Sequence, residues 1–198
     1  LVVEIVDLIG SGGQGEVYRV NVDGQGYALK WYHHPVTDGQ KAVSREQRRA
    51  LIDYLLVNSP PDSRFLWPVG FVDEPEGRTY GYLMPLLPER FQGLESLVLG
   101  RMRPVPSFRV LCRSAIGLAE CFRKLHNMGA CYKDINLGGP VLDPRTGDVM
   151  VCDLDNVRIN KTPGNILVVF FAAPELIRGE GTCQTNTDIH SLAVLLFY

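Results

Sequence analysis

A glycine-rich segment near the start of the chain, GSGGQGEV at residues 10–17, lies between two runs that alternate apolar and polar residues as β-strands do. The dinucleotide-binding fingerprint leads into a helix, whereas the strand pattern GEVYRVNV follows here, which favours a loop between antiparallel strands. Glycine lets backbone amides approach phosphate oxygens without an intervening side chain. The glycines in question are Gly10, Gly12, Gly13 and Gly15. A glycine-rich hairpin without a ligand is the alternative that stays open.

Composition narrows the classes of function. The chain has 198 residues, 45% hydrophobic and 21% charged, and therefore enough apolar material for a substantial core. Its net charge of -2 argues against a nucleic-acid partner. The five cysteines are dispersed without a CxxC pair, which favours buried free thiols in a reducing, cytoplasmic compartment over a zinc site or disulfides. No apolar run is long enough to span a bilayer. The chain starts without methionine and stops inside a helical pattern, so we expect further domains outside it.

Hydrophobic periodicity predicts an α+β chain. In residues 1–84, five short strand patterns form an antiparallel sheet that is interrupted by one amphipathic helix over residues 38–57. Two prolines, Pro85 and Pro88, mark a connector to residues 85–198, which are mainly helical. The strongest helix has Ser107 as its N-cap and Gly129 at its end. Two short strands, PVLD and DVMVCD, follow, and then a last helix that opens at Thr187 or Asp188.

The motif YALK places Lys30 in a strand between two apolar residues. One interpretation is a lysine that contacts the α- and β-phosphates of a nucleotide, and the other is a charge on an edge strand. A phosphate-binding lysine needs a carboxylate to fix it, and Glu46 on the predicted helix is the best candidate, with Asp53 as the second. The alternative for Glu46 is pairing with neighbouring surface arginines.

Six motifs in order resemble the eukaryotic-type (Hanks-type) serine/threonine protein kinases. GSGGQGEV matches the glycine-rich flap and YALK the phosphate-binding lysine; YKD stands for H-R-D, CDLDN for D-F-G, AAPEL for A-P-E, and DIHSLAVLL for the D-x-W-S-L-G helix. The resemblance implies a bilobal kinase-like fold, with a nucleotide-binding lobe at residues 1–84 and an incomplete catalytic lobe at 85–198. It also implies ATP with Mg²⁺ or Mn²⁺ as cofactors and a protein substrate as partner.

The resemblance also implies roles for single residues. Asp134 would accept or orient the proton of the attacking hydroxyl, with Lys30 and Asn136 completing the catalytic set, and Asp153 would hold magnesium. Lys133 resembles a basic switch residue that reads phosphate on Thr162. The remaining nucleotide-binding positions are Val17, Ala28, Glu46, Met84 and Leu86.

The chain departs from the kinase pattern at four places. Gly139 stands where kinases carry the asparagine for a second metal, Asn136 where they carry a lysine, Val168 where they carry a threonine, and Asp155 replaces the glycine of D-F-G. An oxygen of Asn136, Asp155 or Asn156 is the candidate replacement ligand, because magnesium accepts oxygens from any loop. The sequence therefore predicts an ATP-dependent serine/threonine kinase. The alternatives are a nucleotide-binding pseudokinase scaffold or sensor, and a kinase-fold enzyme that acts on a small molecule.

Overall fold

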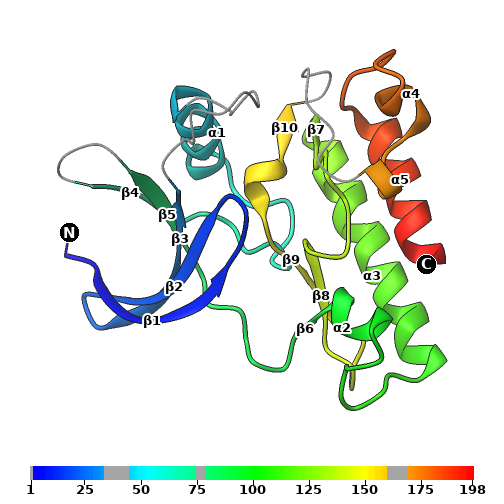
Figure 1. Cartoon of the computed structure of the whole chain (residues 1–198), viewed down its shortest axis with the longest axis horizontal. Coiled ribbons are helices and arrows are strands. Elements are labelled where there is room, and N and C mark those ends of the chain that lie inside the picture. The colour runs from blue at the N-terminus through cyan, green and yellow to red at the C-terminus, as the bar shows by residue number, and fades with distance from the viewer. Residues whose placement is uncertain (1, 34–44, 75–78, 160–168) are drawn as a thin grey trace. The chain divides into compact units, whose positions relative to one another are not determined.

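The computed structural model describes residues 2–33, 45–74, 79–159 and 169–198 (Figure 1). The predicted α+β class with a five-stranded antiparallel sheet is confirmed. The chain divides into two compact units, residues 1–60 with 66–87 and residues 61–65 with 88–198. The short segment 61–65 lies inside the predicted first lobe in sequence and packs with the second unit in space.

The first unit is built on a sheet whose strands lie in the order β1-β2-β3-β5-β4, every neighbouring pair antiparallel. The strands are β1 (Glu4–Ser11), β2 (Gly15–Val22), β3 (Gln25–Tyr32), β4 (Gly70–Asp73) and β5 (Tyr80–Met84). Val20, Val22, Leu29 and Leu83 form the buried cluster on one face. The predicted strand FLWPVGFV is shortened to β4, because Pro68 has no N–H to donate to a sheet.

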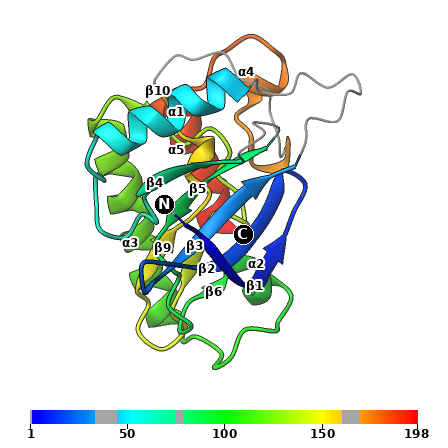
Figure 2. The ribbon, with the colours of Figure 1, turned by 90° about the vertical axis from the view of Figure 1, so that its left-hand side faces the viewer.

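Helix α1 (Arg45–Val57) packs against β4 (Figure 2). Its predicted beginning at Asp38 lies outside the described residues. Ile52 and Leu55 are fully buried on the inner face of the helix. The indole Nε1 of Trp67 donates to the carbonyls of Leu55 at 2.7 Å and Asn58 at 2.9 Å, which satisfies acceptors at the C-terminal end of the helix.

The second unit is organised around the helix α3 (Phe108–Asn127). Ser107 caps it as predicted, with its Oγ accepting from the N–H of Val110 at 3.3 Å, and Gly129 ends it in the left-handed region at φ +75°. The buried face of the helix consists of Ser114, Leu118, Cys121, Phe122 and Leu125. The strongest helical prediction from the sequence is therefore confirmed at both ends.

Short elements complete the second unit. They are β6 (Gln92–Gly93), α2 (Leu94–Val98), β7 (Ala130–Cys131), β8 (Pro140–Leu142), β9 (Val149–Val151), η1 (Leu154–Asn156), β10 (Arg158–Ile159), η2 (Val169–Phe171), α4 (Pro174–Ile177) and α5 (Thr185–Phe197). Helix α5 packs beside α3 and β7. It begins at Thr185, before the predicted start, because the Oγ1 of Thr187 accepts from the N–H of Gln184 at 3.1 Å and closes the first turn.

The cysteines agree only in part with the expectation of buried thiols. All five are free; Cys121, Cys131 and Cys183 are buried, whereas Cys112 on α3 is exposed. Burial raises the pKa of Cys121 and of Cys131 to about 12, so both thiols stay protonated at neutral pH. In the part of the chain that the structure describes, no helix combines the length and the apolar character that crossing a membrane requires.

Candidate nucleotide and catalytic site

The register of the first sheet places four of the predicted nucleotide-binding residues on one face. Lys30 lies opposite Val17 on β2, and Ala28 lies opposite Met84 on β5. Residues directly opposite in antiparallel strands point to the same face, and so do alternate residues of one strand. Val17, Ala28, Lys30 and Met84 therefore share the face opposite to the one on which Leu29 contributes to the apolar cluster.

Lys30 is 7% exposed, which is unusual for an ammonium group in a sheet. Its Nζ lies 5.9 Å from the centre of the Tyr32 ring, on the same face of β3. A strand with neighbours on both sides carries Lys30, since β3 lies between β2 and β5, so the interpretation as an edge-strand charge is wrong. Glu46 is exposed in the first turn of α1. Its pairing with Lys30 stays a prediction, as does the role of Leu86.

The glycine-rich loop contains two kinds of glycine. The N–H of Gly12 donates to the carbonyl of Gly15 at 2.9 Å, which closes the turn between β1 and β2. A β-carbon on Gly10, Gly12 or Gly13 would meet no atom within 4 Å, whereas one on Gly15 would collide with the carbonyl oxygen of Trp31. The first three glycines leave open space above the backbone. Position 15 requires glycine for a structural reason, because β2 and β3 approach too closely there for a side chain.

The second unit brings the loop of Asp134 beside the segment of Asp153. Strand β7, just before the loop, pairs with β10, just after the segment. The N–H of Cys152 donates to the carbonyl of Gly139 at 2.8 Å, and the hydroxyl of Tyr132 donates to the carbonyl of Cys152 at 2.5 Å. The predicted base and the predicted metal ligand are thus on two backbone segments that are bonded to each other at several points.

Two residues, the predicted metal ligand Asp153 and Lys133 next to the predicted base, have left-handed backbone conformations, which residues other than glycine rarely adopt. Among the described residues other than glycine, positive φ angles occur at Asp23 in a hairpin turn, at Lys133 (73°) and at Asp153 (55°). The N–H of Asp134 donates to the carbonyl of Tyr132 at 2.9 Å, so Lys133 is the centre of a three-residue turn. Each such conformation costs on the order of 1–3 kcal/mol, and such strain concentrates at functional sites.

The side chain of Asp188 holds the backbone just before Asp134 in place through hydrogen bonds, a role that the sequence did not reveal. Its carboxylate is buried and accepts from the N–H of Tyr132 at 2.5 Å and from that of Lys133 at 3.0 Å. His126 at the end of α3 contacts the same carboxylate at 3.0 Å through Nε2. His126 thus helps to hold the carboxylate of Asp188 in place. Asp188 opens the motif DIHSLAVLL, which was the only signal available in the sequence.

Asn136 braces the loop with both polar atoms of its side chain. Its Nδ2 donates to the carbonyl of Asp134 at 3.0 Å, and its Oδ1 accepts from the N–H of Gly138 at 2.7 Å. A cation at Oδ1 would have only the second lone pair of that oxygen. Asp155 is 5% exposed within the short helix η1. The roles of Asn136, Asp155 and Asn156 as metal ligands stay predictions.

The side chain of Asp153 fits a magnesium or manganese ion, because magnesium prefers oxygen ligands and this carboxylate is half-exposed. Across the described ranges, no three His, Cys, Asp or Glu side chains gather into a preformed cation site. Lys133, the predicted switch residue, is half-buried, and its pKa is lowered by burial and then by Arg158. Its predicted partner Thr162 lies outside the described residues, as does Val168.

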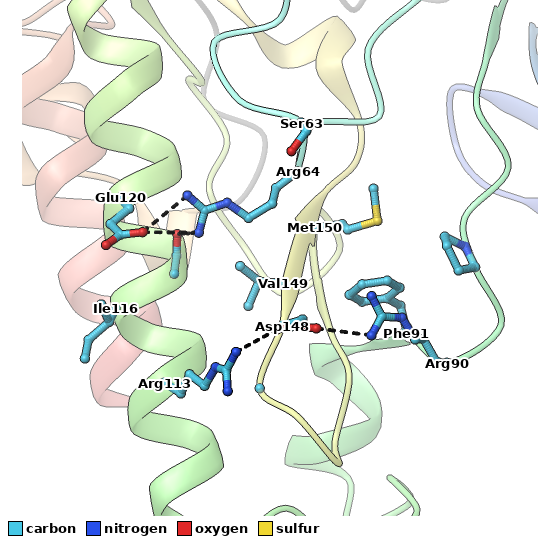
Figure 3. A pocket seen from close by; sticks show the side chains of 13 residues that line it. Ser63, Arg64, Arg90, Phe91, Arg113, Ile116, Glu120, Asp148, Val149 and Met150 are labelled. Carbon is cyan, nitrogen blue, oxygen red and sulfur yellow. Dashed lines mark hydrogen bonds and ion pairs between the residues drawn. The ribbon is translucent and has the colours of Figure 1, made fainter.

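A separate cavity of about 590 Å³ lies in the second unit, where none of the predicted site residues lines it (Figure 3). Three arginines reach it, and each faces a carboxylate: Arg64 lies 3.3 Å from Glu120, whereas Arg90 and Arg113 lie 3.1 and 3.3 Å from Asp148. Arg64 and Arg90 also pair with Asp62 and Asp143, at 2.8 and 3.2 Å, so all three guanidinium groups are held in ion pairs with carboxylates. Arg64 also forms a bidentate pair with the buried Asp62, at 2.8 Å for both bonds.

The fold and these segments define a class. A five-stranded antiparallel sheet with one helix, followed by a mainly helical unit, is consistent with the first lobe and part of the second lobe of a protein-kinase-like fold. Part of the chain is similar to protein kinases of fungi. It is 32% identical over 76 residues to protein kinase MCK1 of Saccharomyces cerevisiae, which covers 36% of this chain and 20% of that protein.

A second similar protein is glycogen synthase kinase 1 of Pyricularia oryzae, 31% identical over 84 residues, or 39% of this chain and 21% of that protein. The chain thus matches about a fifth of the length of these curated relatives. No protein-family model matches the chain.

Proposed function

We propose that this chain is an ATP-dependent protein kinase that transfers the γ-phosphate to serine or threonine of a protein substrate. Lys30 would hold the α- and β-phosphates, Asp153 a divalent cation, and Asp134 the proton of the attacking hydroxyl. The observation that carries the proposal is the bonding of the Asp134 loop to the Asp153 segment through β7 and β10, Cys152 and Tyr132. The similarity to two protein kinases supports the same class of reaction.

The sheet supports the nucleotide part of the proposal. Val17, Ala28 and Met84 provide an apolar surface on the same face as Lys30, which suits a purine ring beside a phosphate-binding cation. The open space above Gly10, Gly12 and Gly13 leaves the loop backbone accessible to phosphate oxygens. The magnesium or manganese ion would neutralise phosphate charge when it is bound. The cytoplasmic location stays a prediction.

A nucleotide-binding pseudokinase, acting as a scaffold or sensor, is the second candidate. Gly139 favours it, because glycine has no ligand atom and because Tyr132 fills the space beside it. Asn136, which stands in the place of a phosphate-contacting lysine, is occupied in bracing the loop. Losing one preorganised electrostatic group in a catalytic site lowers the rate on the order of 100- to 1000-fold. The loss of two such groups would leave a kinase with almost no phosphate transfer.

Transfer of labelled phosphate from ATP to a generic protein acceptor, with Mg²⁺ and with Mn²⁺, separates the two candidates. The whole chain should transfer phosphate, and Asp134→Asn should reduce the rate by at least about 100-fold without loss of folding. Thermal stabilisation by ATP without any transfer would select the pseudokinase. Transfer that is unchanged in Asp134→Asn would remove Asp134 from its proposed role.

A further inference from the structure

Tyr132 occupies the space into which a side chain at position 139 would project. A β-carbon built on Gly139 would lie 2.5 Å from the hydroxyl oxygen of Tyr132 and 3.2 Å from its Cζ. The first distance is below the 3.0 Å that β-carbons keep from other atoms in proteins. Position 139 is therefore restricted to glycine for as long as Tyr132 keeps its place.

Several contacts keep Tyr132 in that place. The side chain is fully buried, its hydroxyl donates to the carbonyl of Cys152 at 2.5 Å, and its ring packs edge-on against Phe122 with centroids 5.6 Å apart. Its backbone N–H donates to the carboxylate of Asp188. Burial, and then the nearby Asp153, raises the pKa of the hydroxyl well above its ordinary value, so the group remains a hydrogen-bond donor.

Position 139 has a chemical meaning in phosphoryl transfer, because protein kinases hold two Mg²⁺ ions, one with the D-F-G aspartate and one with the catalytic-loop asparagine. We propose that Tyr132 closes the second of these positions, so that this chain binds ATP with one divalent cation, held by Asp153, instead of two. The inference rests on the proposed nucleotide site and specifies its metal content. The inference also explains why position 139 is glycine: the buried side chain of Tyr132 leaves no room there for the side chain of a metal ligand.

One candidate replacement ligand, Asn136, already uses both polar atoms of its side chain within the loop. The other two candidates, Asp155 and Asn156, are buried in η1. Tyr132 itself directs its proton at the carbonyl of Cys152, the residue before Asp153. The tyrosine thus replaces a metal contact between the two segments with a direct hydrogen bond.

The number of bound Mn²⁺ ions per ATP, measured by electron paramagnetic resonance on the whole chain at saturating ATP, tests the proposal. The wild type should bind one Mn²⁺ per bound ATP. Tyr132→Leu, which opens the space without adding a ligand, should also bind one. The double variant Tyr132→Leu/Gly139→Asn should bind two.

The outcomes are separable. Two Mn²⁺ ions per ATP in the wild type would overturn the inference and leave nucleotide binding intact, whereas no ATP binding would overturn the proposed function and the inference with it. One ion in a folded, ATP-binding double variant would overturn the role of Tyr132. If the double variant does not fold, the effect of Gly139→Ala on the melting temperature decides the role of Tyr132, and an equal loss in the wild type and in Tyr132→Leu would overturn it. As a second readout, Gly139→Ala should lower the melting temperature of the wild type and have little effect in Tyr132→Leu.

Discussion

The carboxylate of Asp188 on α5 accepts a hydrogen bond from the backbone N–H of Tyr132 at 2.5 Å, across 56 residues of sequence. The neighbouring N–H of Lys133 and the imidazole of His126 contact the same carboxylate. Two of these partners are the residues immediately before Asp134. The position of the proposed base therefore depends on a carboxylate that cannot reach a substrate itself, because it is buried beneath the loop.

Asp188→Asn should destabilise the second unit. The amide replaces one acceptor oxygen with a donor that faces backbone N–H groups, so at least one buried N–H loses its partner, and we expect a loss of about 2–4 kcal/mol in the free energy of unfolding. Urea denaturation followed by fluorescence measures it. The matched control is Glu180→Gln, in an exposed pair with Arg178, which should change stability by less than about 1 kcal/mol. Equal effects in the two variants would contradict the role of Asp188.

The glycine-rich loop should respond differently at two positions. Gly15→Ala should cost about 1–3 kcal/mol of stability, because the new methyl group meets the carbonyl of Trp31. Gly12→Ala has open space, so its melting temperature should stay near that of the wild type while its affinity for ATP falls. Thermal denaturation with and without ATP measures both effects. A stable Gly15→Ala, or an unchanged affinity in Gly12→Ala, would show that the glycine concerned has another role.

Acid stability should depend on Asp62, which pairs with Arg64 and Lys124 on the side of α3. The hydrogen bonds from Arg64 hold the pKa of this carboxyl well below its usual range, against the opposing effect of burial. The unfolded chain therefore binds the proton more readily, and the contribution to stability is complete above about pH 5 and declines as the pH falls below about 4. Urea titrations at several pH values measure it.

Asp62→Asn supplies the comparison for that titration. It should lose on the order of 3 kcal/mol at pH 7 and should show a shallower decline of stability in acid. Its difference from the wild type should therefore narrow as the pH falls. A constant difference between pH 7 and pH 3 would mean that the carboxylate of Asp62 does not carry this dependence.

Lys30→Met should leave the sheet intact, since methionine retains the length of the buried stem, and should weaken ATP binding about 10- to 100-fold through the loss of one charged phosphate contact. Fluorescent-nucleotide displacement gives the ratio. The control Arg123→Met removes an exposed positive charge from α3 and should bind ATP as the wild type does. If both variants lose affinity equally, the effect is one of net charge and Lys30 has no specific contact.

The sequence predicted those elements whose signals are local. Alternation identified β1, β2 and β3, and a serine N-cap followed by an apolar stripe identified α3 at both ends. Strands of two residues such as β7 and β10 carry no periodicity, and they became visible only in the structure. Strand β4 was predicted from the run FLWPVGFV, but it is shorter than predicted because of Pro68.

For the candidate site, motifs in the sequence identified the residues, whereas the reason why Gly139 departs from the kinase motif became visible only from packing in the structure. Gly139 stood out as a missing ligand, but nothing in a linear sequence connects it with Tyr132, seven positions earlier, through a hydroxyl group and a missing β-carbon. The anchoring of the loop by Asp188 is a contact across 56 residues and equally invisible to local patterns. Steric relationships between distant positions are fixed by the tertiary fold.

Isothermal titration calorimetry of the whole, folded chain with ATP and ADP, with and without Mg²⁺ or Mn²⁺, tests nucleotide binding most directly. We predict a saturable heat of binding with a dissociation constant of about 1 μM to 1 mM, as is common for substrates of enzymes, and its loss in Lys30→Met. No heat of binding with either nucleotide under any of these ionic conditions, from protein shown to be folded by circular dichroism, would contradict a nucleotide site in this chain.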